Sequence, residues 1–271
     1  MGGKIFEMKG ITKSFPGVKA LAQVDFSSFP GEVHGLVGEN GAGKSTLMKI
    51  LAGAYYPDEG KILLKEKEVV FDSPSDAQKH GISVIYQEFN LVPELNVAEN
   101  IFLGREPRKL GRLVIDKATL YDRSKEILAS LGTELDPHTK VKDLSVAHQQ
   151  MVEISKALCL NADIIVMDEP SAVVSGKELD SLFRIIRSLK NQGKAIIFIS
   201  HRIDEIFEIA DRATVLKDGK LVGTVRPCDV DKSTIIRMMV GRTLDQTYPL
   251  RELGERREIL SVNNLCRGKV L

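Results

Sequence analysis

The sequence predicts an α/β protein whose largely parallel sheet is interrupted by a helical segment. Short apolar runs such as "GEVHGLVG", "DIIVMDEP" and "KAIIFIS" have the length and composition of buried strands, and helical patterns lie between them. Apolar strands that alternate with helices are typical of a parallel sheet covered on both faces. From Glu88 to about Ser155 the pattern is helical, with no clear strand. We therefore expect an α/β core with a helical insertion.

The first part of this core follows from local patterns. "KIFEMKGI" alternates apolar and polar residues and precedes the turn residues "FPG", as a strand does. "GEVHGLVG" predicts a buried strand and "KSTLMKILAG" the helix after it, with a further strand at "ISVIYQ". In the insertion, "VAENIFLG" and "DRSKEILASLG" carry most of the helical periodicity, and Gly132 is placed as a helix stop.

Strands return in the second part of the core. Between "DIIVMDEP" and "KAIIFIS" lies "GKELDSLFRIIRSLKNQG", an amphipathic helix whose apolar face consists of Leu179, Leu182, Ile185, Ile186 and Leu189. The stretch "LKDGKLVG" carries an Asp-Gly turn and predicts a hairpin.

Composition narrows the class of protein. The 271 residues include 43% apolar and 28% charged residues, which is ordinary for a globular chain. With 38 basic and 37 acidic residues the net charge is +1, which argues against a general electrostatic grip on nucleic acid or anionic lipid. The three cysteines lack metal or redox spacing, so we expect reduced thiols in the cytosol. No apolar run approaches the roughly 20 residues that cross a bilayer, so we expect another subunit to hold any membrane attachment.

The stretch "GENGAGKST", Gly38 to Thr46, matches G-x-x-x-x-G-K-[ST] between a predicted strand and a predicted helix. The glycines let successive N–H groups point at phosphate oxygens, and the helix N-terminus adds a partial positive charge. Lys44 can reach the β- and γ-phosphates of a nucleotide, and Ser45 can offer a hydroxyl to Mg²⁺. The pattern predicts a nucleotide phosphate site rather than a plain glycine-rich turn.

The run "DIIVMDE" supplies the acidic half of this chemistry. Its apolar strand delivers Asp168 to the carboxyl end of the sheet, where the carboxylate can hold a magnesium-bound water. Glu169 follows and is placed to orient or deprotonate an attacking water. Two acids at a strand end could also be simple edge solvation, but the phosphate loop upstream favours catalysis.

A phosphate loop alone fits GTPases, small-molecule kinases and many ATPases, although no N-K-x-D stretch is present to read guanine. The remaining motifs are Gln87 after "ISVIY", the loop "LSVAHQQ", Glu169 after Asp168, and His201 in "IFISHR". Their order resembles the ATP-binding-cassette (ABC) family over residues 4 to about 245. The resemblance implies a P-loop core with a mostly parallel sheet, an N-terminal antiparallel β portion and a helical subdomain at about residues 88–155.

In that family two cassettes close head to tail over two ATP molecules. By the resemblance, the signature loop of residues 144–150 touches the γ-phosphate of the ATP held by the opposite cassette. Gln87 contacts Mg²⁺ and the attacking water and leads into the surface that docks a membrane subunit, and His201 reads the γ-phosphate. The implied catalytic residues are thus Glu169, His201 and Gln87, and the implied metal ligands are Ser45, Gln87 and Asp168.

The resemblance also places the nucleoside. Phe15 stands where the family sets an aromatic ring against adenine, and Val18 would border the ribose. Without the resemblance, Phe15 would be assigned to the core, and His201 more often to a structural role. The full set of expected ATP contacts is Phe15, Val18, Gly38, Asn40, Gly41, Ala42, Gly43, Lys44, Ser45, Thr46, Ser145, Ala147 and Gln149.

A narrower resemblance is to the first half of tandem ATPases that energise bacterial import of ribose, galactose and related sugars. It rests on "VGENGAGKST", "AENIFLGRE", "QQMVEISKAL", "SHRIDEIFEIADRATVLKDG" and "MMVGRTLDQTYP". It implies an ATPase at the cytoplasmic face of the inner membrane, with permease subunits, an external sugar-binding protein reached indirectly, and no nucleic acid as partners. Because "REILSVNNL" repeats the pattern of "GKIFEMKGI", we expect a cassette at 1–245 and, at 246–271, a linker and the truncated start of a second cassette.

Two departures from the family pattern leave alternatives open. Ala147 stands where the signature usually has Gly, and "SAVVS" at residues 171–175 replaces the usual T-S-A-L-[TD]. If position 147 needs a left-handed backbone, alanine costs about 1–2 kcal/mol there, so that Ala147→Gly would raise hydrolysis several-fold in a homodimer of this chain and much less in a tandem protein. The chain could therefore bind ATP and dimerise but hydrolyse poorly, or it could be an ABC protein outside transport. The sequence names neither the sugar nor the direction of transport.

Overall fold

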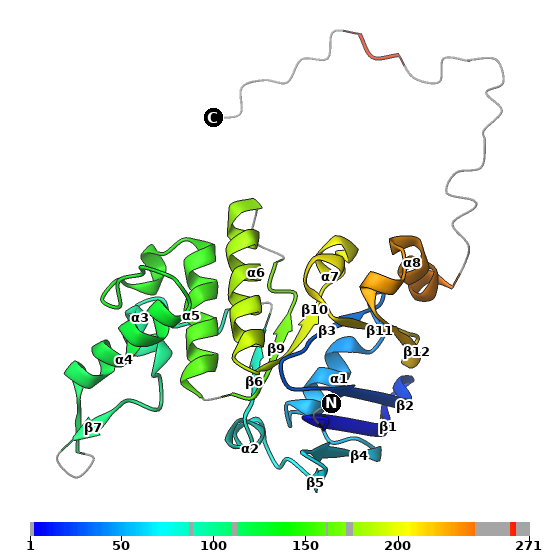
Figure 1. Ribbon diagram of the computed structural model, residues 1–271, viewed down its shortest axis with the longest axis horizontal. Coiled ribbons are helices and arrows are strands. Elements are labelled where there is room, and N and C mark those ends of the chain that lie inside the picture. Colours follow the sequence, from blue (N-terminus) through cyan, green and yellow to red (C-terminus); the bar gives the residue numbers. More distant parts are fainter. Residues whose placement is uncertain are drawn as a thin grey trace.

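The computed structural model describes residues 3–86, 89–109, 113–160, 162–171, 176–241 and 261–263. Within these ranges the chain forms a central sheet, a smaller antiparallel sheet and a helical subdomain (Figure 1). In Figure 1 the helical subdomain lies on the left and the antiparallel sheet at the lower right. The predicted α/β class with a helical insertion is confirmed. None of the helices in the described part of the chain has the length and apolar character needed to cross a bilayer.

The central sheet has the strand order β12-β11-β3-β10-β9-β6. Five of its strands are parallel to their neighbours, as the apolar runs predict, and only β12 is antiparallel. The strands are β3 (Val33–Val37), β6 (Ile82–Ile85), β9 (Ile164–Asp168), β10 (Ala195–Ile199), β11 (Arg212–Lys217) and β12 (Lys220–Val225). The β11–β12 hairpin is the one that the Asp-Gly turn predicts.

The N-terminal sheet has the order β2-β1-β4-β5, with antiparallel pairs throughout. Its strands are β1 (Phe6–Phe15), β2 (Val18–Ser28), β4 (Glu59–Leu64) and β5 (Lys67–Val69). The sheet lies beside the helix that follows β3, so the antiparallel β portion implied by the resemblance is present.

The helices that cover the sheets are α1 (Lys44–Leu51), α2 (Pro74–Lys79), α6 (Gly176–Asn191), α7 (Ile203–Ile209) and α8 (Lys232–Val240). A short 3-10 helix, η2 (Pro227–Asp229), precedes α8. The predicted apolar face of α6 is confirmed, because Leu182, Ile185, Ile186 and Leu189 are buried and Leu179 is partly buried.

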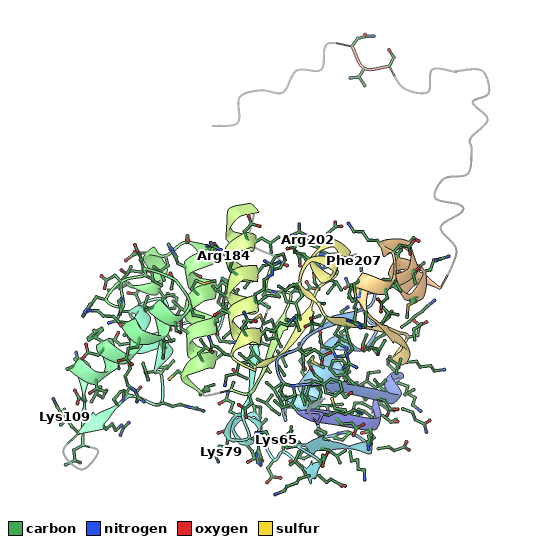
Figure 2. All side chains as sticks on the ribbon, in the orientation of Figure 1. Lys65, Lys79, Lys109, Arg184, Arg202 and Phe207 are labelled. Atoms are coloured by element: carbon green, nitrogen blue, oxygen red, sulfur yellow. The ribbon has the colours of Figure 1, made fainter. Side chains whose placement is uncertain are left out.

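The helical subdomain contains α3 (Val97–Ile101), α4 (Lys117–Ser130), η1 (Val141–Asp143) and α5 (Val146–Cys159). Gly132 has φ 68 just after α4, so its role as a helix stop is confirmed. The expectation of no strand here is wrong in one detail. A small hairpin joins β7 (Arg108–Lys109) to β8 (Val114–Ile115), and two-residue strands are too short to produce an alternating pattern. Lys109 marks this hairpin at the far tip of the subdomain (Figure 2).

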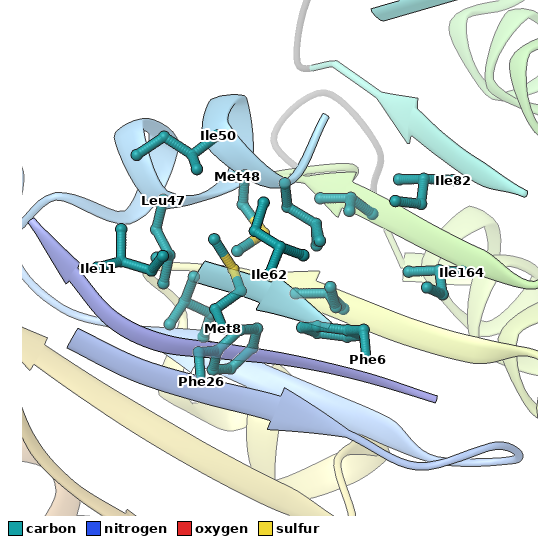
Figure 3. Packing of buried hydrophobic residues seen from close by; sticks show 14 of the residues in the cluster. Phe6, Met8, Ile11, Phe26, Leu47, Met48, Ile50, Ile62, Ile82 and Ile164 are labelled. Atoms are coloured by element: carbon teal, nitrogen blue, oxygen red, sulfur yellow. The ribbon is translucent and has the colours of Figure 1, made fainter. Parts of the chain in front are cut away.

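Three apolar clusters hold these parts together. The first fills the space between the N-terminal sheet, α1 and one face of the central sheet, where Phe6, Met8 and Leu47 are fully buried (Figure 3). The second covers the opposite face with α5, α6, α7 and α8. The third lies inside the helical subdomain. Helix α5 contributes Ile154 to the second cluster and Val152 to the third, so this helix joins the subdomain to the core.

A buried polar network crosses the central sheet at His34 of β3, which is 1% exposed. Its Nε2 lies 2.7 Å from Thr214 Oγ1, and Thr214 Oγ1 lies 2.8 Å from Thr224 Oγ1. Its Nδ1 lies 3.3 Å from Nη2 of Arg212, which also pairs with Glu32. Burial lowers the pKa of His34 to about 4, although Glu32 opposes the shift. The imidazole is therefore neutral in the folded protein at neutral pH.

This depressed pKa predicts an acid sensitivity of the fold. Between pH 6.5 and 4 the unfolded chain binds the His34 proton and the folded chain does not, so the free energy of unfolding falls as pH falls. A shift from 6.5 to about 4 corresponds to about 3 kcal/mol. Urea unfolding across this range should show a shallower pH slope in His34→Gln than in the wild type. His138→Gln, at an exposed histidine, is the matched control, and equal slopes in the His34 variant and the wild type would contradict the assignment.

Candidate nucleotide-binding site

The phosphate loop connects β3 to α1 and is shaped by glycines. Gly41 and Gly43 have φ 84 and 99, a region that favours glycine. A Cβ at Gly43 would lie 2.6 Å from Ala20 O and 2.7 Å from Leu21 Cδ2, so only glycine fits there. Gly43 is the N-cap of α1 and offers no side-chain cap, unlike the N-caps of α2, α3, α4, α5 and α8. The first amides of α1 are thus left for an anion.

Lys44 begins α1 and is 7% exposed. Its Nζ donates to Gly38 O at 2.7 Å and to Glu39 O at 3.1 Å, so the side chain curls over its own loop. Burial lowers the pKa of Lys44, and the charges of Glu169 and Asp168 oppose the shift. The ammonium group therefore lies within electrostatic reach of both acids. Asn40 and Ser45 are exposed on the same loop and first helical turn.

The acidic pair lies at the carboxyl end of β9, as the sequence predicts. Asp168 is the last residue of β9 and is the register partner of Ile199 in β10. Its pKa is raised by burial and then by the like charge of Glu169, while Lys44 and Lys49 lower it. Glu169 follows with φ 49, and its amide donates to Ile199 O at 3.0 Å. The two strand ends are thus tied together by main-chain contacts.

His201 follows β10 and meets Glu169 directly. Its Nδ1 lies 3.2 Å from Glu169 Oε1, and the imidazole side chain is 57% exposed. The structure therefore brings together Lys44, Asp168, Glu169 and His201, which the sequence spreads over more than half of the chain. They meet because β3, β9 and β10 are parallel, so their carboxyl ends share one edge of the sheet.

The two residues expected at the nucleoside face each other across the turn between β1 and β2. Phe15 and Val18 are register partners, 37% and 63% exposed. This exposure excludes a core role for Phe15, whose ring lies partly exposed on the surface. The same β2 strand passes the phosphate loop two residues later, at Ala20, so the hairpin end and the loop are neighbours.

Two further aromatic residues belong to this region and were missed in the sequence. Tyr55 packs edge-on against Phe15, with ring centroids 5.4 Å apart. Tyr86, 37% exposed, follows β6, and its pKa is raised by burial and by the charge of Asp168. The position of Tyr86 at the carboxyl end of a parallel strand could have identified it, whereas nothing in the local sequence pairs Tyr55 with Phe15.

The signature residues lie elsewhere, at the N-terminus of α5 in the helical subdomain. Ser145 is the N-cap, and its Oγ accepts from His148 N at 3.3 Å. Gln149 donates from Nε2 to Val141 O and Leu144 O, at 3.4 and 3.2 Å, so its amide supports the preceding turn. Ser145 and Ala147 line a cavity of about 580 Å³ between α4, α5 and α6. The phosphate loop is not part of this cavity's lining.

The backbone at Ala147 is not left-handed, which was the condition for strain at this position. Ala147 lies in the first turn of right-handed helix α5 and is absent from the positive-φ residues of the described chain. The expected strain of about 1–2 kcal/mol for a left-handed alanine therefore does not arise. Ala147 differs from glycine only by its methyl group and its lower flexibility.

Some expected residues cannot be placed. Gln87 and residues 172–175 lie outside the described residues, as do residues 246–260 and 264–271. Of the segment at 171–175 only Ser171 is described, and it is buried. No group of three or more acidic, histidine or cysteine side chains suited to a metal occurs within the described ranges. The hydroxyl of Ser45 and the carboxylate of Asp168 are hard oxygen donors, which fits Mg²⁺ because that ion takes few protein ligands and binds phosphate oxygens.

Comparison with known proteins identifies the family of the chain. The family model described as ABC transporter matches residues 21–172. The chain is 52% identical over 267 residues to a ribose import ATP-binding protein of Rubrobacter xylanophilus, covering 98% of this chain and 53% of the relative. It is 49% identical to a putative ribose/galactose/methyl galactoside import ATP-binding protein of Burkholderia cenocepacia, covering 98% and 51%. The chain thus spans about half the length of these curated relatives.

Solved structures agree. The ADP conformation of MJ1267, an ATP-binding cassette of an ABC transporter, has a TM-score of 0.78 and 27% identity, covering 89% of this chain and 100% of that one. A dimeric post-hydrolysis state of the ATP-binding cassette MJ0796, bound to ADP and Pi, has a TM-score of 0.70 and 25% identity, covering 82% and 98%. The family model, the relatives and the solved structures agree, and the chain belongs to the ABC transporter family.

Proposed function

We propose that this chain binds ATP with Mg²⁺ and hydrolyses it as the first cassette of a bacterial importer of a monosaccharide. The observation that carries the proposal is the meeting of a phosphate loop, an acidic strand end and a histidine at one edge of the sheet, with Glu169 Oε1 3.2 Å from His201 Nδ1. The names of the relatives support a sugar of the ribose or galactose type. The sugar itself is selected by other subunits.

The proposed roles follow from position. The amides of the loop from Gly38 to Thr46 and the Lys44 ammonium hold the phosphates. Glu169 orients or deprotonates the attacking water, and His201 contacts the γ-phosphate while its Nδ1 faces Glu169. Phe15 and Val18 hold the nucleoside. Ser45, Asp168 and Gln87 would hold Mg²⁺, which would supply positive charge to the phosphates when bound.

We propose a second cassette as the partner that completes the site. Ser145 and Ala147 lie on the helical subdomain, away from their own phosphate loop, and therefore suit an ATP held by the opposite cassette. Gln149 Nε2 supports the turn that precedes α5. Permease subunits would hold the assembly at the cytoplasmic face of the inner membrane, with an external sugar-binding protein as an indirect partner.

The competing proposal is a module that binds ATP and dimerises but hydrolyses slowly. It rests on Ala147 and on residues 171–175. The argument from Ala147 assumed a strained, left-handed backbone, and the backbone there is right-handed. Glu169 and His201 are both present and in contact, which favours hydrolysis.

The shape of the phosphate loop can be tested with two alanine substitutions. Both Gly41→Ala and Gly43→Ala put a side chain at positive φ, but only the second meets backbone, at 2.6 Å from Ala20 O. We expect Gly43→Ala to weaken ATP binding at least tenfold in calorimetric titration, because the loop must move. Gly41→Ala, with open space around its Cβ, is the matched control and should weaken it much less. Equal losses would show that the close approach is unimportant.

Hydrolysis can be separated from binding at Glu169. Glu169→Gln keeps the size of the side chain but removes the base, so steady-state ATP turnover should fall at least a hundredfold while ATP affinity stays within about threefold. Phosphate release and nucleotide titration measure the two quantities on the same protein. Turnover in the variant comparable to wild type would refute the proposed role, and no turnover in the wild type under any condition would refute the ATPase itself.

The revised backbone at Ala147 changes the result expected for Ala147→Gly. Because no left-handed strain is relieved, we expect ATP turnover to change by less than about threefold, and the free energy of unfolding to fall by up to about 1 kcal/mol through lower helix propensity. Turnover at several protein concentrations and urea unfolding measure both. A gain of tenfold or more would mean that the methyl group blocks the γ-phosphate.

A further inference from the structure

Glu205 is a buried acid outside the residues assigned so far. It lies in the first turn of α7 and is 2% exposed. Its Oε2 accepts hydrogen bonds from Ser171 Oγ at 2.6 Å and from Ser200 Oγ at 2.7 Å. Both serines are also buried, at 2% and 1% exposure. One carboxylate oxygen therefore joins two segments that are far apart in the sequence.

These two segments carry the reactive pair. Ser171 comes two residues after Glu169, and Ser200 directly precedes His201. The backbone continues the link, because Glu169 N donates to Ile199 O at 3.0 Å and Arg202 N donates to Ser200 Oγ at 3.0 Å. Glu205 thus connects the turn after β9 to the turn after β10, and these two turns carry Glu169 and His201.

The other oxygen of Glu205 faces Arg202, which Figure 2 shows at the start of α7. Oε1 receives no well-aligned hydrogen bond among the described residues, but Arg202 Nη1 lies 2.9 Å from it, so the contact is an ion pair. The carboxylate is accordingly compensated by two hydroxyl groups and one guanidinium group. A buried charge needs such partners to be tolerated.

Stability alone does not call for this arrangement. Replacing a buried polar group and its partners by apolar groups of similar shape is often neutral or stabilising. Glu169 and His201, by contrast, need neighbouring residues to hold them in place. Glu169 has φ 49, and the His201 side chain is largely exposed. A residue other than glycine at such a φ persists when its surroundings hold it.

We propose that Glu205 is a positioning residue for ATP hydrolysis: through Ser171 and Ser200 it holds the Glu169 and His201 turns in register. This inference rests on the proposed ATPase function. Glu205 itself touches neither nucleotide nor water in this role. Its removal should therefore lower kcat without weakening ATP binding.

The test compares three variants of the full chain. Glu205→Leu leaves both serine hydroxyls buried without an acceptor, and the triple variant E205L/S171A/S200A removes those hydroxyls as well. Glu205→Gln keeps an amide oxygen that accepts from both serines. We expect kcat to fall at least tenfold in Glu205→Leu with KM for ATP within about twofold, and Glu205→Gln to retain kcat within about threefold.

The triple variant separates positioning from stability. Its thermal unfolding temperature should recover part of the way toward wild type, because no buried hydroxyl lacks a partner although the Arg202 amide loses its acceptor on Ser200, while kcat should stay low. Recovery of kcat together with stability would overturn the proposal. Ser124→Ala is the matched control, since Ser124 is a fully buried serine whose Oγ donates to Leu120 O at 2.8 Å within α4. It should leave kcat unchanged.

A second readout does not depend on turnover. The Glu169 amide is protected by Ile199 O, so its hydrogen exchange reports whether the two turns stay together. In Glu205→Leu we expect this amide to exchange at least tenfold faster, with the central β9 and β10 amides unchanged. Unchanged exchange at Glu169 would overturn the link whatever the activity. If the Glu169 amide exchanges faster in Glu205→Leu but the wild type hydrolyses no ATP, the ATPase proposal is refuted. Glu205 would then link the two turns without a role in hydrolysis.

Discussion

The architecture depends on the close packing of three backbone segments around Ala20. Gly43 of the phosphate loop and Gly219 of the β11–β12 turn both approach Ala20 O so closely that a Cβ on either would lie 2.6 Å from it. Gly219 O also accepts from Ala22 N, and Gly219 N donates to Ala42 O. This contact fixes the N-terminal sheet against the edge where the parallel strands end. The exposed Phe15 hairpin end and the phosphate loop are consequently neighbours on one surface.

The helical subdomain is joined to the core through α5, and polar side chains hold the segment that follows β6 against its helices. Glu153 accepts from Asn90 N at 2.7 Å, and Lys156 Nζ donates to Asn90 O at 2.9 Å. Asn100 is fully buried and accepts from Val92 N at 2.7 Å. Burial raises the pKa of Glu153, so the bond to Asn90 is made in a poorly solvated place. The segment that follows Gln87 is therefore bound to the helical subdomain.

Much of this could be predicted because the signals are local. The phosphate loop, the apolar strands and the α6 face each follow from residues near one another, and parallel pairing then brings Lys44, Asp168, Glu169 and His201 to one edge. What escaped prediction depends on contacts between distant segments. The β7–β8 hairpin has two-residue strands, Tyr55 meets Phe15 only after folding, and the backbone at Ala147 is decided by where α5 begins. Ser171 and Ser200 have no sequence pattern that points to Glu205.

Helix α5 is one continuous helix that connects Ser145 to the contact between Glu153 and Asn90. Ser145 caps the N-terminus of α5. Glu153 lies about 12 Å along the helix axis and accepts a hydrogen bond from Asn90 N. Because a helix does not shorten or bend easily, a displacement at one of these points is transmitted to the other. If a ligand favoured one position of Ser145 and a partner favoured one position of Asn90, α5 would connect the two sites. Thermodynamic linkage would then require each to change the affinity of the other by the same factor.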